Sequence, residues 1–282
     1  MNLRKVVIRF REKGGSAAEW GYKAAKKLQS KGIAAVVESS AVGRGQSAAC
    51  DADLVVVVGG DGTLLRLIDL CGGSPPPVLG FAAESLGYLL PHSVETLEVV
   101  LEKAMAGECE VRRVRLGEYS SQAITGYFLN EVGLWAPRGK LIEFTMYVGG
   151  FFYKARSDGV IVSTSAGSTA HALSYGASII VNFDEPILEA VFPGALSPLV
   201  KPLIAYNKSM EILLSQNSET AHLIVDGRYV ADLPPGSEVK VSPSQKNLEL
   251  VTVESYAVDL ARKLYLRLID MGRWQGSLNV SR

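Results

Sequence analysis

Residues 54–66 have the sequence LVVVVGGDGTLLR. The apolar run at its start predicts a strand buried on both faces, and this strand ends at paired glycines. An apolar helical pattern then resumes at Leu64. Glycines let backbone N–H groups approach an anion, and the start of the helix adds partial positive charge. The stretch therefore predicts a phosphate-binding loop between a strand and a helix, composed of Gly59, Gly60, Gly62, Thr63 and Arg66.

Asp61 is the carboxylate inside this loop, at the position where a phosphate and an acceptor hydroxyl would meet. A carboxylate there can accept a proton from the hydroxyl or hold a metal ion beside the phosphates, and both roles stay open. The alternative is a simple turn, because Asp-Gly pairs tolerate unusual backbone angles. No Gly-Lys-Ser/Thr follows, so the loop is not a Walker A motif, and we expect Mg²⁺ or another divalent cation to accompany a triphosphate.

The first hundred residues alternate between apolar strands and amphipathic helices, which predicts a parallel sheet with crossover helices. A capping-box pattern at Ser16–Glu19 predicts where the first helix begins. The predicted strands are 5–10, 33–37, 54–58 and 78–82, and the predicted helices are 17–30, 63–70 and 94–106.

After Gly107 the pattern changes to short strands joined by tight turns. Gly149-Gly150 and Asp226-Gly227 each lie between two strand-like runs, as in β-hairpins, and the second turn needs no role beyond geometry. Residues 258–271 return to an amphipathic helical pattern that can pack on the first domain. We expect an α/β domain at 1–107, joined by 258–282, and a β-rich domain at 108–257.

Residues 163–169 form a hydroxyl-rich segment, STSAGST, with five serines and threonines in seven positions. Helix capping would account for two of these hydroxyls, so we interpret the segment as favouring a ligand. A helix is expected at 169–175. Together with the phosphate loop, this segment indicates a nucleotide.

The composition excludes several other classes of protein. Lysine plus arginine equals aspartate plus glutamate at 29 each, so nothing in the net charge indicates a nucleic acid or an anionic membrane as partner. No apolar run reaches the length of a membrane-spanning helix. The three cysteines lack CxxC spacing, which fits neither a disulfide framework nor a zinc site, and we expect a cytoplasmic location.

Three segments resemble the signatures of the NAD kinase family, in the same order and with similar separation. They are GGDGTLLR at 59–66, LNE at 129–131 and SDGVIVSTSAGSTAHALSYGA at 157–177. The resemblance implies a Rossmann- or phosphofructokinase-like parallel sheet in the first domain. It also implies transfer of a phosphoryl group from ATP to the adenosine ribose of NAD.

The resemblance further implies roles for individual residues. Asp61 faces the ribose 2′-hydroxyl, Asn130 and Glu131 bind a ribose, and Asp158 fixes the nicotinamide carboxamide. The remaining NAD- or NADP-binding residues implied in this way are Gly62, Tyr88, Arg156, Thr169, Ala170, His171 and Ser174. The resemblance to NAD kinases also implies that the protein is a homodimer or homotetramer.

Some positions depart from the family pattern. His171 stands where tyrosine is common, Ala83-Glu84-Ser85 replaces a glycine-bearing turn, and the stretch 194–202 lacks the usual histidine and arginine. Two alternatives therefore stay open: a catalytically weak NADP-binding sensor, and a lipid or sugar kinase that shares the GGDGT loop. The sequence leaves open the phosphoryl donor, ATP or polyphosphate, and the acceptor, NAD or NADH.

Overall fold

The computed structural model describes residues 3–12, 15–43, 45–83, 89–122 and 124–256. Within these residues the chain forms two compact units. Unit 1 contains residues from 3–64, 76–112 and 250–256, and unit 2 contains 65–75 and 113–249. The predicted helix at 258–271, and the domain boundary that depends on it, lie outside the described residues.

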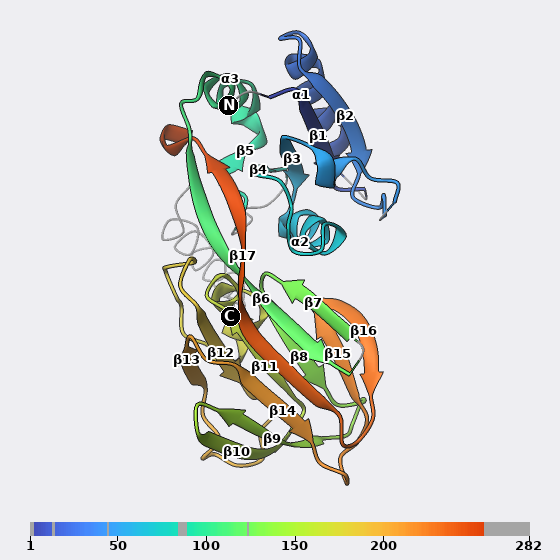
Figure 1. Ribbon diagram of the computed structural model, residues 1–282, viewed down its shortest axis with the longest axis vertical. Helices are drawn as coiled ribbons and strands as arrows, with labels where there is room; N and C mark the ends of the chain where they lie inside the picture. Colours follow the sequence, from blue (N-terminus) through green and yellow to red (C-terminus); the bar gives the residue numbers. More distant parts are fainter. Residues whose placement is uncertain (1–2, 13–14, 44, 84–88, 123, 257–282) are drawn as a thin grey trace, which may run out of the picture. The chain divides into compact units, whose positions relative to one another are not determined.

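Unit 1 is built on a parallel sheet whose strands lie in the order β17-β4-β3-β1-β2 (Figure 1). A short strand, β5, also pairs with β4. Strands β1, β3 and β4 carry almost unbroken buried apolar residues, as expected for strands covered on both faces. The strands are β1 (Lys5–Phe10), β2 (Ala34–Ser39), β3 (Leu54–Gly59), β4 (Val78–Ala82), β5 (His92–Ser93) and the end of β17 (Glu238–Thr252).

Two helices of unit 1, α1 and α3, contribute to one hydrophobic core with the sheet. Leu28 of α1 and Leu101 of α3 are buried in this core beside Val56 of β3. Helix α3 ends at Gly107, whose φ of 82° gives the left-handed cap that glycine adopts without steric cost. The helices and helical turns of the unit are α1 (Ala17–Gln29), η1 (Ala49–Asp51), the start of α2 (Asp61–Leu70), η2 (Val94–Thr96), α3 (Leu97–Ala106) and η5 (Glu254–Tyr256).

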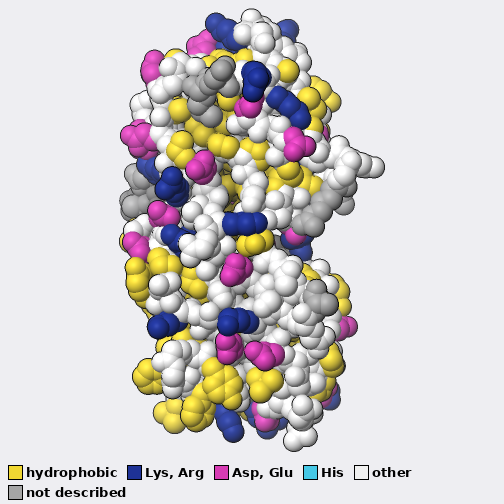
Figure 2. All heavy atoms as spheres, viewed as in Figure 1, with side chains coloured by type: hydrophobic (Ala, Val, Ile, Leu, Met, Phe, Trp, Pro, Cys, Tyr) yellow, Lys and Arg dark blue, Asp and Glu magenta, His cyan; other side chains and the backbone are white. Residues whose placement is uncertain are grey.

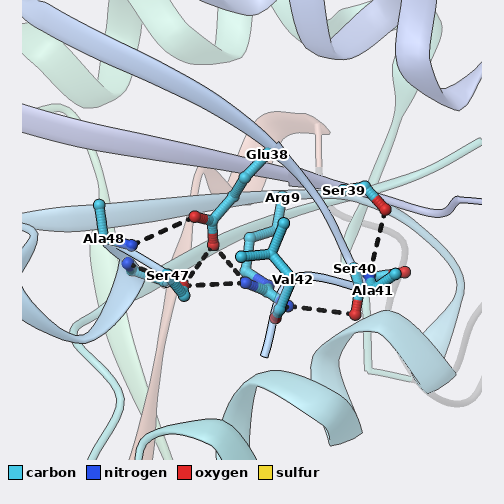
Figure 3. Close-up of polar contacts among 9 residues, drawn as sticks. Arg9, Glu38, Ser39, Ser40, Ala41, Val42, Ser47 and Ala48 are labelled. Atoms are coloured by element: carbon cyan, nitrogen blue, oxygen red, sulfur yellow. Dashed lines mark hydrogen bonds and ion pairs between the residues drawn. The ribbon is translucent and has the colours of Figure 1, made fainter. Parts of the chain in front are cut away.

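A buried ion pair fixes the loop that follows β2 (Figure 3). Arg9 of β1 and Glu38 of β2 are neighbours in the parallel register, and both side chains are almost completely buried. The guanidinium group also donates to the carbonyl oxygens of Ser40 and Val42, each at 3.2 Å, and to Ser47 Oγ at 3.0 Å. The carboxylate of Glu38 accepts from Ser47 Oγ at 2.6 Å. The loop is therefore held at the carboxyl end of the sheet by charge-assisted hydrogen bonds.

Unit 2 consists of two antiparallel sheets (Figure 1). One has the strand order β10-β9-β14-β17, with β6 beside β17 and β7 beside β6, and the other has the order β13-β12-β11-β8-β15-β16. The strands are β6 (Glu110–Ser121), β7 (Ile124–Phe128), β8 (Glu131–Trp135), β9 (Ile142–Val148), β10 (Phe151–Ser157), β11 (Gly159–Thr164), β12 (Ile187–Val191), β13 (Leu203–Tyr206), β14 (Met210–Leu214), β15 (Ala221–Val225) and β16 (Arg228–Leu233).

The two sheets of unit 2 share one core, because their alternate residues contribute to a single buried cluster. Phe144 of β9 and Ile212 of β14 lie in it together with Val162 of β11. Strand β11 is buried at all its residues, since Ile161 on its other face packs with Ala172 and Ala177. The segment that follows β11 therefore covers this strand.

The structure confirms the predicted fold class, an α/β part with a parallel sheet and a β-rich part. The hairpins at Gly149-Gly150 and Asp226-Gly227 are also confirmed. The predicted start of the first helix after Ser16 is confirmed, although Ser16 makes no side-chain capping hydrogen bond. One local prediction is wrong: residues 169–175 form no α-helix but lie in and between two 3₁₀ turns, η3 (Ala166–Thr169) and η4 (His171–Tyr175).

The expectation about the cysteines is wrong as well. Cys50 and Cys71 are disulfide-bonded, and the free thiol among the described residues is Cys109. Disulfide formation depends on the distance between cysteines in the folded chain, which their spacing in the sequence does not give. The cysteine pattern therefore carries no argument about localisation.

The distribution of charged side chains and the hydropathy of the helices agree with what the composition predicts. Basic and acidic side chains are interspersed on the face in Figure 2. Within the described ranges, no helix combines the length and the apolar character needed to cross a membrane.

We predict that Arg9→Met destabilises unit 1 by about 3–5 kcal/mol, because it leaves the Glu38 carboxylate buried without its counter-charge. Urea unfolding monitored by circular dichroism measures the loss. The double variant Arg9→Met with Glu38→Leu should lose less, since no unpaired charge remains buried. Lys140→Met, in an exposed pair with Glu219, should stay within about 0.5 kcal/mol of wild type. Equal losses of stability for Arg9→Met and Lys140→Met would contradict the predicted cost of leaving Glu38 buried without Arg9.

Candidate functional site

The predicted phosphate loop connects β3 to α2 in unit 1. Gly59 ends the strand, and Thr63 donates its backbone N–H to the carbonyl oxygen of Gly60 at 2.9 Å. A Cβ atom at Gly59 would lie 2.8 Å from Thr63 Oγ1, so this position excludes a side chain. At Gly60 and Gly62 an added Cβ would meet nothing within 4 Å. These two glycines therefore leave open space beside the start of the helix, and neither has a positive φ.

Asp61 is the first residue of α2, two residues earlier than the predicted helix start. Its side chain is partly exposed, and its Oδ1 accepts the backbone N–H of Leu89 at 3.1 Å. The N-terminus of a helix carries partial positive charge, which favours an anion there. Arg66 lies exposed further along the same helix.

A second candidate region, in unit 2, is a corner of the chain held by one carboxylate. Asp226 Oδ2 accepts the N–H of Leu129 at 2.9 Å, and Oδ1 accepts those of Asn130 at 2.8 Å and Glu131 at 3.1 Å. In return, the N–H of Asp226 donates to the carbonyl oxygen of Glu131 at 3.0 Å. We call residues 129–131 with Asp226 the acidic corner. The interpretation of Asp226-Gly227 as a turn alone is therefore incomplete.

The acidic corner also fixes the hydroxyl-rich segment. The carbonyl oxygen of Asn130 accepts the N–H of Thr164 at 3.0 Å, and Thr164 Oγ1 donates to the carbonyl oxygen of Leu129. A Cβ at Gly167 would lie 1.9 Å from the carbonyl oxygen of Asn130, which is far inside contact distance. The close approach therefore requires glycine at 167 and brings the segment directly against Asn130.

The five hydroxyls of this segment hold the segment itself. Each is buried and donates to a backbone carbonyl oxygen; the donors are Ser163, Thr164, Ser165, Ser168 and Thr169. Ser168 Oγ additionally accepts the N–H of Ile180 at 3.0 Å. The number of hydroxyls is thus explained by internal hydrogen bonds, and the inference of a ligand from that number is not supported by their geometry.

Glu131 is a buried carboxyl at the acidic corner. Burial, together with the charge of Asp226, raises the pKa of Glu131 to about 8, although the backbone N–H of His171 donates to it. Its Oε2 atom is buried without a hydrogen-bond partner among the described residues. Burial also raises the pKa of Asp226 to about 6, against the effect of its three N–H donors and of Arg228. Strongly perturbed carboxyls of this kind are typical of functional sites.

An aromatic group lies beside this corner. The ring of His171 stacks on Trp135 with 5.5 Å between centroids, and Tyr175 contacts both rings at 5.8 and 5.4 Å from Trp135 and His171. A Cβ at Gly133 would lie 2.5 Å from Trp135 Nε1, so a glycine in the strand makes room for the indole. His171, Ser174 and Tyr175 are exposed residues.

Arg156 lies on β10, and Asp158 follows directly after this strand. Asp158 is exposed, and its backbone N–H donates to the carbonyl oxygen of Pro193 at 3.0 Å. A Cβ at Gly194 would lie 2.1 Å from Asp158 Oδ2, which explains why this chain has glycine at 194. Arg156 is exposed and forms an ion pair with Glu143 at 3.7 Å.

The structure therefore brings part of the predicted set together. Asn130, Glu131 and His171 are joined by direct contacts, and Thr169 and Ala170 lie in the segment between them. Tyr88 lies outside the described residues, as do Glu84 and Ser85. Sequence reasoning missed Asp226 and Trp135; glycines inside strands, such as Gly133, were the available signal for a close packing partner.

The comparisons with known proteins cover both units. Residues 11–109 match the family model of the ATP-NAD kinase N-terminal domain, and residues 129–253 match that of the ATP-NAD kinase C-terminal domain. The NAD kinase of Teredinibacter turnerae is 34% identical over 218 residues, which cover 72% of each chain. The NAD kinase of Methanothermobacter thermautotrophicus is 30% identical over 229 residues, 79% of this chain and 78% of the relative. This chain belongs to the NAD kinase family.

Solved structures agree with this membership. The crystal structure of an NAD kinase from Archaeoglobus fulgidus in complex with ATP has a TM-score of 0.73 and 25% identity, covering 90% of this chain and 95% of that chain. Yeast NADH kinase complexed with NADH has a TM-score of 0.77 and 21% identity, covering 89% of this chain and 83% of that chain, which shows likeness of fold.

We predict that Glu131→Gln stabilises the protein increasingly as pH rises from about 5 to about 8. The unfolded chain ionises Glu131 near its ordinary pKa of 4.5, whereas the folded chain keeps the proton up to about 8. Wild-type stability therefore falls across this window, and the variant escapes that loss, which is on the order of several kcal/mol. Urea unfolding at several pH values measures the difference.

The exposed Glu249→Gln serves as the matched control, because the side chain of Glu249 is 42% exposed. Its stability should run parallel to that of the wild type across the pH range. If Glu131→Gln also ran parallel to the wild type, the raised pKa of Glu131 would be refuted.

Proposed function

We propose that this chain is an NAD kinase that transfers the terminal phosphoryl group of ATP to the 2′-hydroxyl of the adenosine ribose of NAD, giving NADP. The observation that carries the proposal is the presence of both NAD kinase family domains in one chain. The exposed start of α2 at Asp61 and the acidic corner are consistent with it, because phosphoryl transfer mainly requires that two bound nucleotides be aligned.

Within this proposal Asp61 accepts the proton of the ribose hydroxyl as it attacks the terminal phosphorus of ATP. Its partial exposure at the beginning of a helix leaves the carboxylate accessible to a substrate. The alternative role, as an anchor for a metal ion, differs in a measurable way. A base affects turnover, whereas an anchor changes the concentration of metal that the reaction needs.

Asn130 and Glu131 bind a ribose of NAD in this proposal. The pair offers an amide and a carboxyl, which together match the donors and acceptors of a diol. Asp158 holds the nicotinamide carboxamide, and its exposed carboxylate beside Gly194 suits that role. The adenosine and phosphate contacts are assigned to Gly62, Tyr88, Arg156, Thr169, Ala170, His171 and Ser174.

Thr169 contributes through its backbone or methyl group, because its hydroxyl already donates to the carbonyl oxygen of Ala166 at 3.3 Å. His171 offers an exposed imidazole stacked on Trp135, a flat surface suited to a base or a nicotinamide ring.

Mg²⁺ accompanies ATP in this proposal. The described residues contain no cluster of three or more His, Cys, Asp or Glu side chains that could hold a metal ion. Mg²⁺ commonly binds through substrate phosphates with one or two carboxylates, and Asp61 is the carboxylate of the phosphate loop. The ion would neutralise charge on the phosphates, and the chain would supply the alignment.

We also propose a cytoplasmic homodimer or homotetramer. Unit 2 exposes large apolar side chains that would be buried in an interface between copies; examples are Val181, Leu196, Leu199, Ile204 and Tyr206. Hydrophobic side chains are also visible at the lower end of the face in Figure 2, in the region of the β9–β10 hairpin, where Phe151 and Phe152 are exposed. Light scattering on the purified protein measures the oligomeric state.

A donor-by-acceptor activity assay tests the proposed function. Purified protein is incubated with ATP or polyphosphate as donor, NAD or NADH as acceptor, and Mg²⁺, and NADP or NADPH is measured. NADP formed from ATP and NAD is the expected result. If the protein binds NADP but forms no product with any of the donors, the alternative of a catalytically weak NADP-binding sensor would be favoured instead.

We predict that Asp61→Asn lowers kcat by about 10²–10⁴-fold while the dissociation constant for NAD changes by less than about threefold, because the amide accepts no proton. The exposed Asp51→Asn should leave both quantities unchanged. The Mg²⁺ dependence of the residual activity separates the two roles. An unchanged dependence supports the base, a raised Mg²⁺ requirement supports the anchor, and an unchanged kcat rejects both.

A further inference from the structure

Arg228 is a charged residue beside the acidic corner that the proposed reaction does not use. It is the first residue of β16, directly after the Asp226-Gly227 turn. Its Nη1 atom donates to Asp69 Oδ2 at 2.6 Å, and both residues belong to unit 2. The side chain is 39% exposed, yet its Nε atom is buried without a hydrogen-bond partner among the described residues. The guanidinium group is therefore held close to the protein interior.

Arg228 also acts on Asp226. Its positive charge lowers the pKa of Asp226, opposing the burial that raises this pKa. Conversely, the carboxylates of Asp69 and Asp226 both raise the pKa of Arg228. One guanidinium group therefore lies within electrostatic range of two carboxylates, with a hydrogen bond to only one of them.

Two further ionisable groups interact with these residues. The charge of Asp226 raises the pKa of Glu131 in β8. The pKa of Tyr119 in β6 is raised by the charges of Asp69 and Asp226 and lowered by that of Arg228. Of the five interacting residues Asp69, Tyr119, Glu131, Asp226 and Arg228, only Arg228 is a cation. Its removal would leave the three backbone N–H donors to oppose the effect of burial on Asp226, so protonation of Asp226 would become more favourable.

Protonation of Asp226 would weaken the acidic corner. An ionised carboxylate accepts hydrogen bonds on both oxygens, and such bonds are stronger than neutral ones. Asp226 uses both oxygens to accept three consecutive N–H groups of residues 129–131. A protonated carboxyl carries a donor on one oxygen, so it cannot hold this arrangement equally well.

On the basis of the proposed function, we propose that Arg228 is a positioning residue for NAD. Its charge keeps Asp226 ionised, and Asp226 in turn holds Asn130 and Glu131 in the arrangement that binds the ribose. Arg228 therefore contributes to NAD affinity through Asp226 and does not contact the reacting atoms.

The test compares Arg228→Met with Arg228→Lys, in steady-state kinetics and calorimetric NAD binding between about pH 6 and about pH 8. Relative to the wild type at the same pH, Arg228→Met should weaken NAD binding about fivefold near pH 6, because a rise of about one unit from a pKa of about 6 lowers the ionised fraction of Asp226 from about one half to about one tenth. The loss should shrink to less than about 1.5-fold near pH 8, where Asp226 is ionised in both proteins. Arg228→Lys keeps the charge and should restore most of the affinity.

Two further measurements separate this role from packing. The value of kcat at saturating NAD and the KM for ATP should stay within about twofold of wild type in Arg228→Met. Asp69→Asn removes the hydrogen-bond partner but leaves the cation beside Asp226, so it should not reproduce the pH-dependent loss. The exposed Arg113→Met, whose guanidinium lies 4.0 Å from Glu249, is the matched control.

A loss of NAD binding that is equal at every pH and not rescued by lysine would overturn the inference, as would the same pH dependence in Asp69→Asn. Failure of the proposed function is recognised separately, because the wild type would then form no NADP. The calorimetric NAD measurements would still test Arg228 in that case.

Discussion

The β-rich unit depends on the carboxylate of Asp226, which accepts three consecutive backbone N–H groups. The turn that presents it requires φ values of 48° and 73°, which Asp and Gly tolerate. The corner shaped in this way places the carbonyl oxygen of Asn130 where it accepts the N–H of Thr164 and excludes any side chain at Gly167. A single buried charge thus connects the β15–β16 turn, the start of β8 and the segment after β11.

This arrangement keeps two acids buried side by side at a cost in stability. Glu131 retains its proton at neutral pH, and Asp226 ionises only because N–H donors and Arg228 offset its burial. A corner with a purely structural role would be served by apolar residues or by neutral hydrogen-bonding groups. The presence of both acids is understandable if a polar ligand supplies the hydrogen bond that Glu131 Oε2 lacks.

Features that depend on local pattern were predictable from the sequence, and features that depend on long-range contacts were not. The strands at 5–10 and 78–82 were predicted with their observed ends, because both segments are rich in apolar and β-branched residues. The burial of Glu131 depends on long-range contacts, and three of the hydroxyls in STSAGST donate to residues twenty or more positions away. The number of hydroxyls could not distinguish donors to a ligand from donors to the backbone.

The two Asp-Gly pairs of the chain show why a motif needs its surroundings. Asp61-Gly62 and Asp226-Gly227 have the same sequence, but the first carboxylate is partly exposed at the beginning of a helix and the second is buried. A carboxylate that accepts three N–H groups has its lone pairs directed to the backbone, so Asp226 is unsuited to accept a substrate proton. The same bonds make it suited to hold neighbouring residues in place. The proposed assignment of Asp61 to chemistry and of Asp226 to positioning rests on exposure and hydrogen bonding, which the shared dipeptide does not encode.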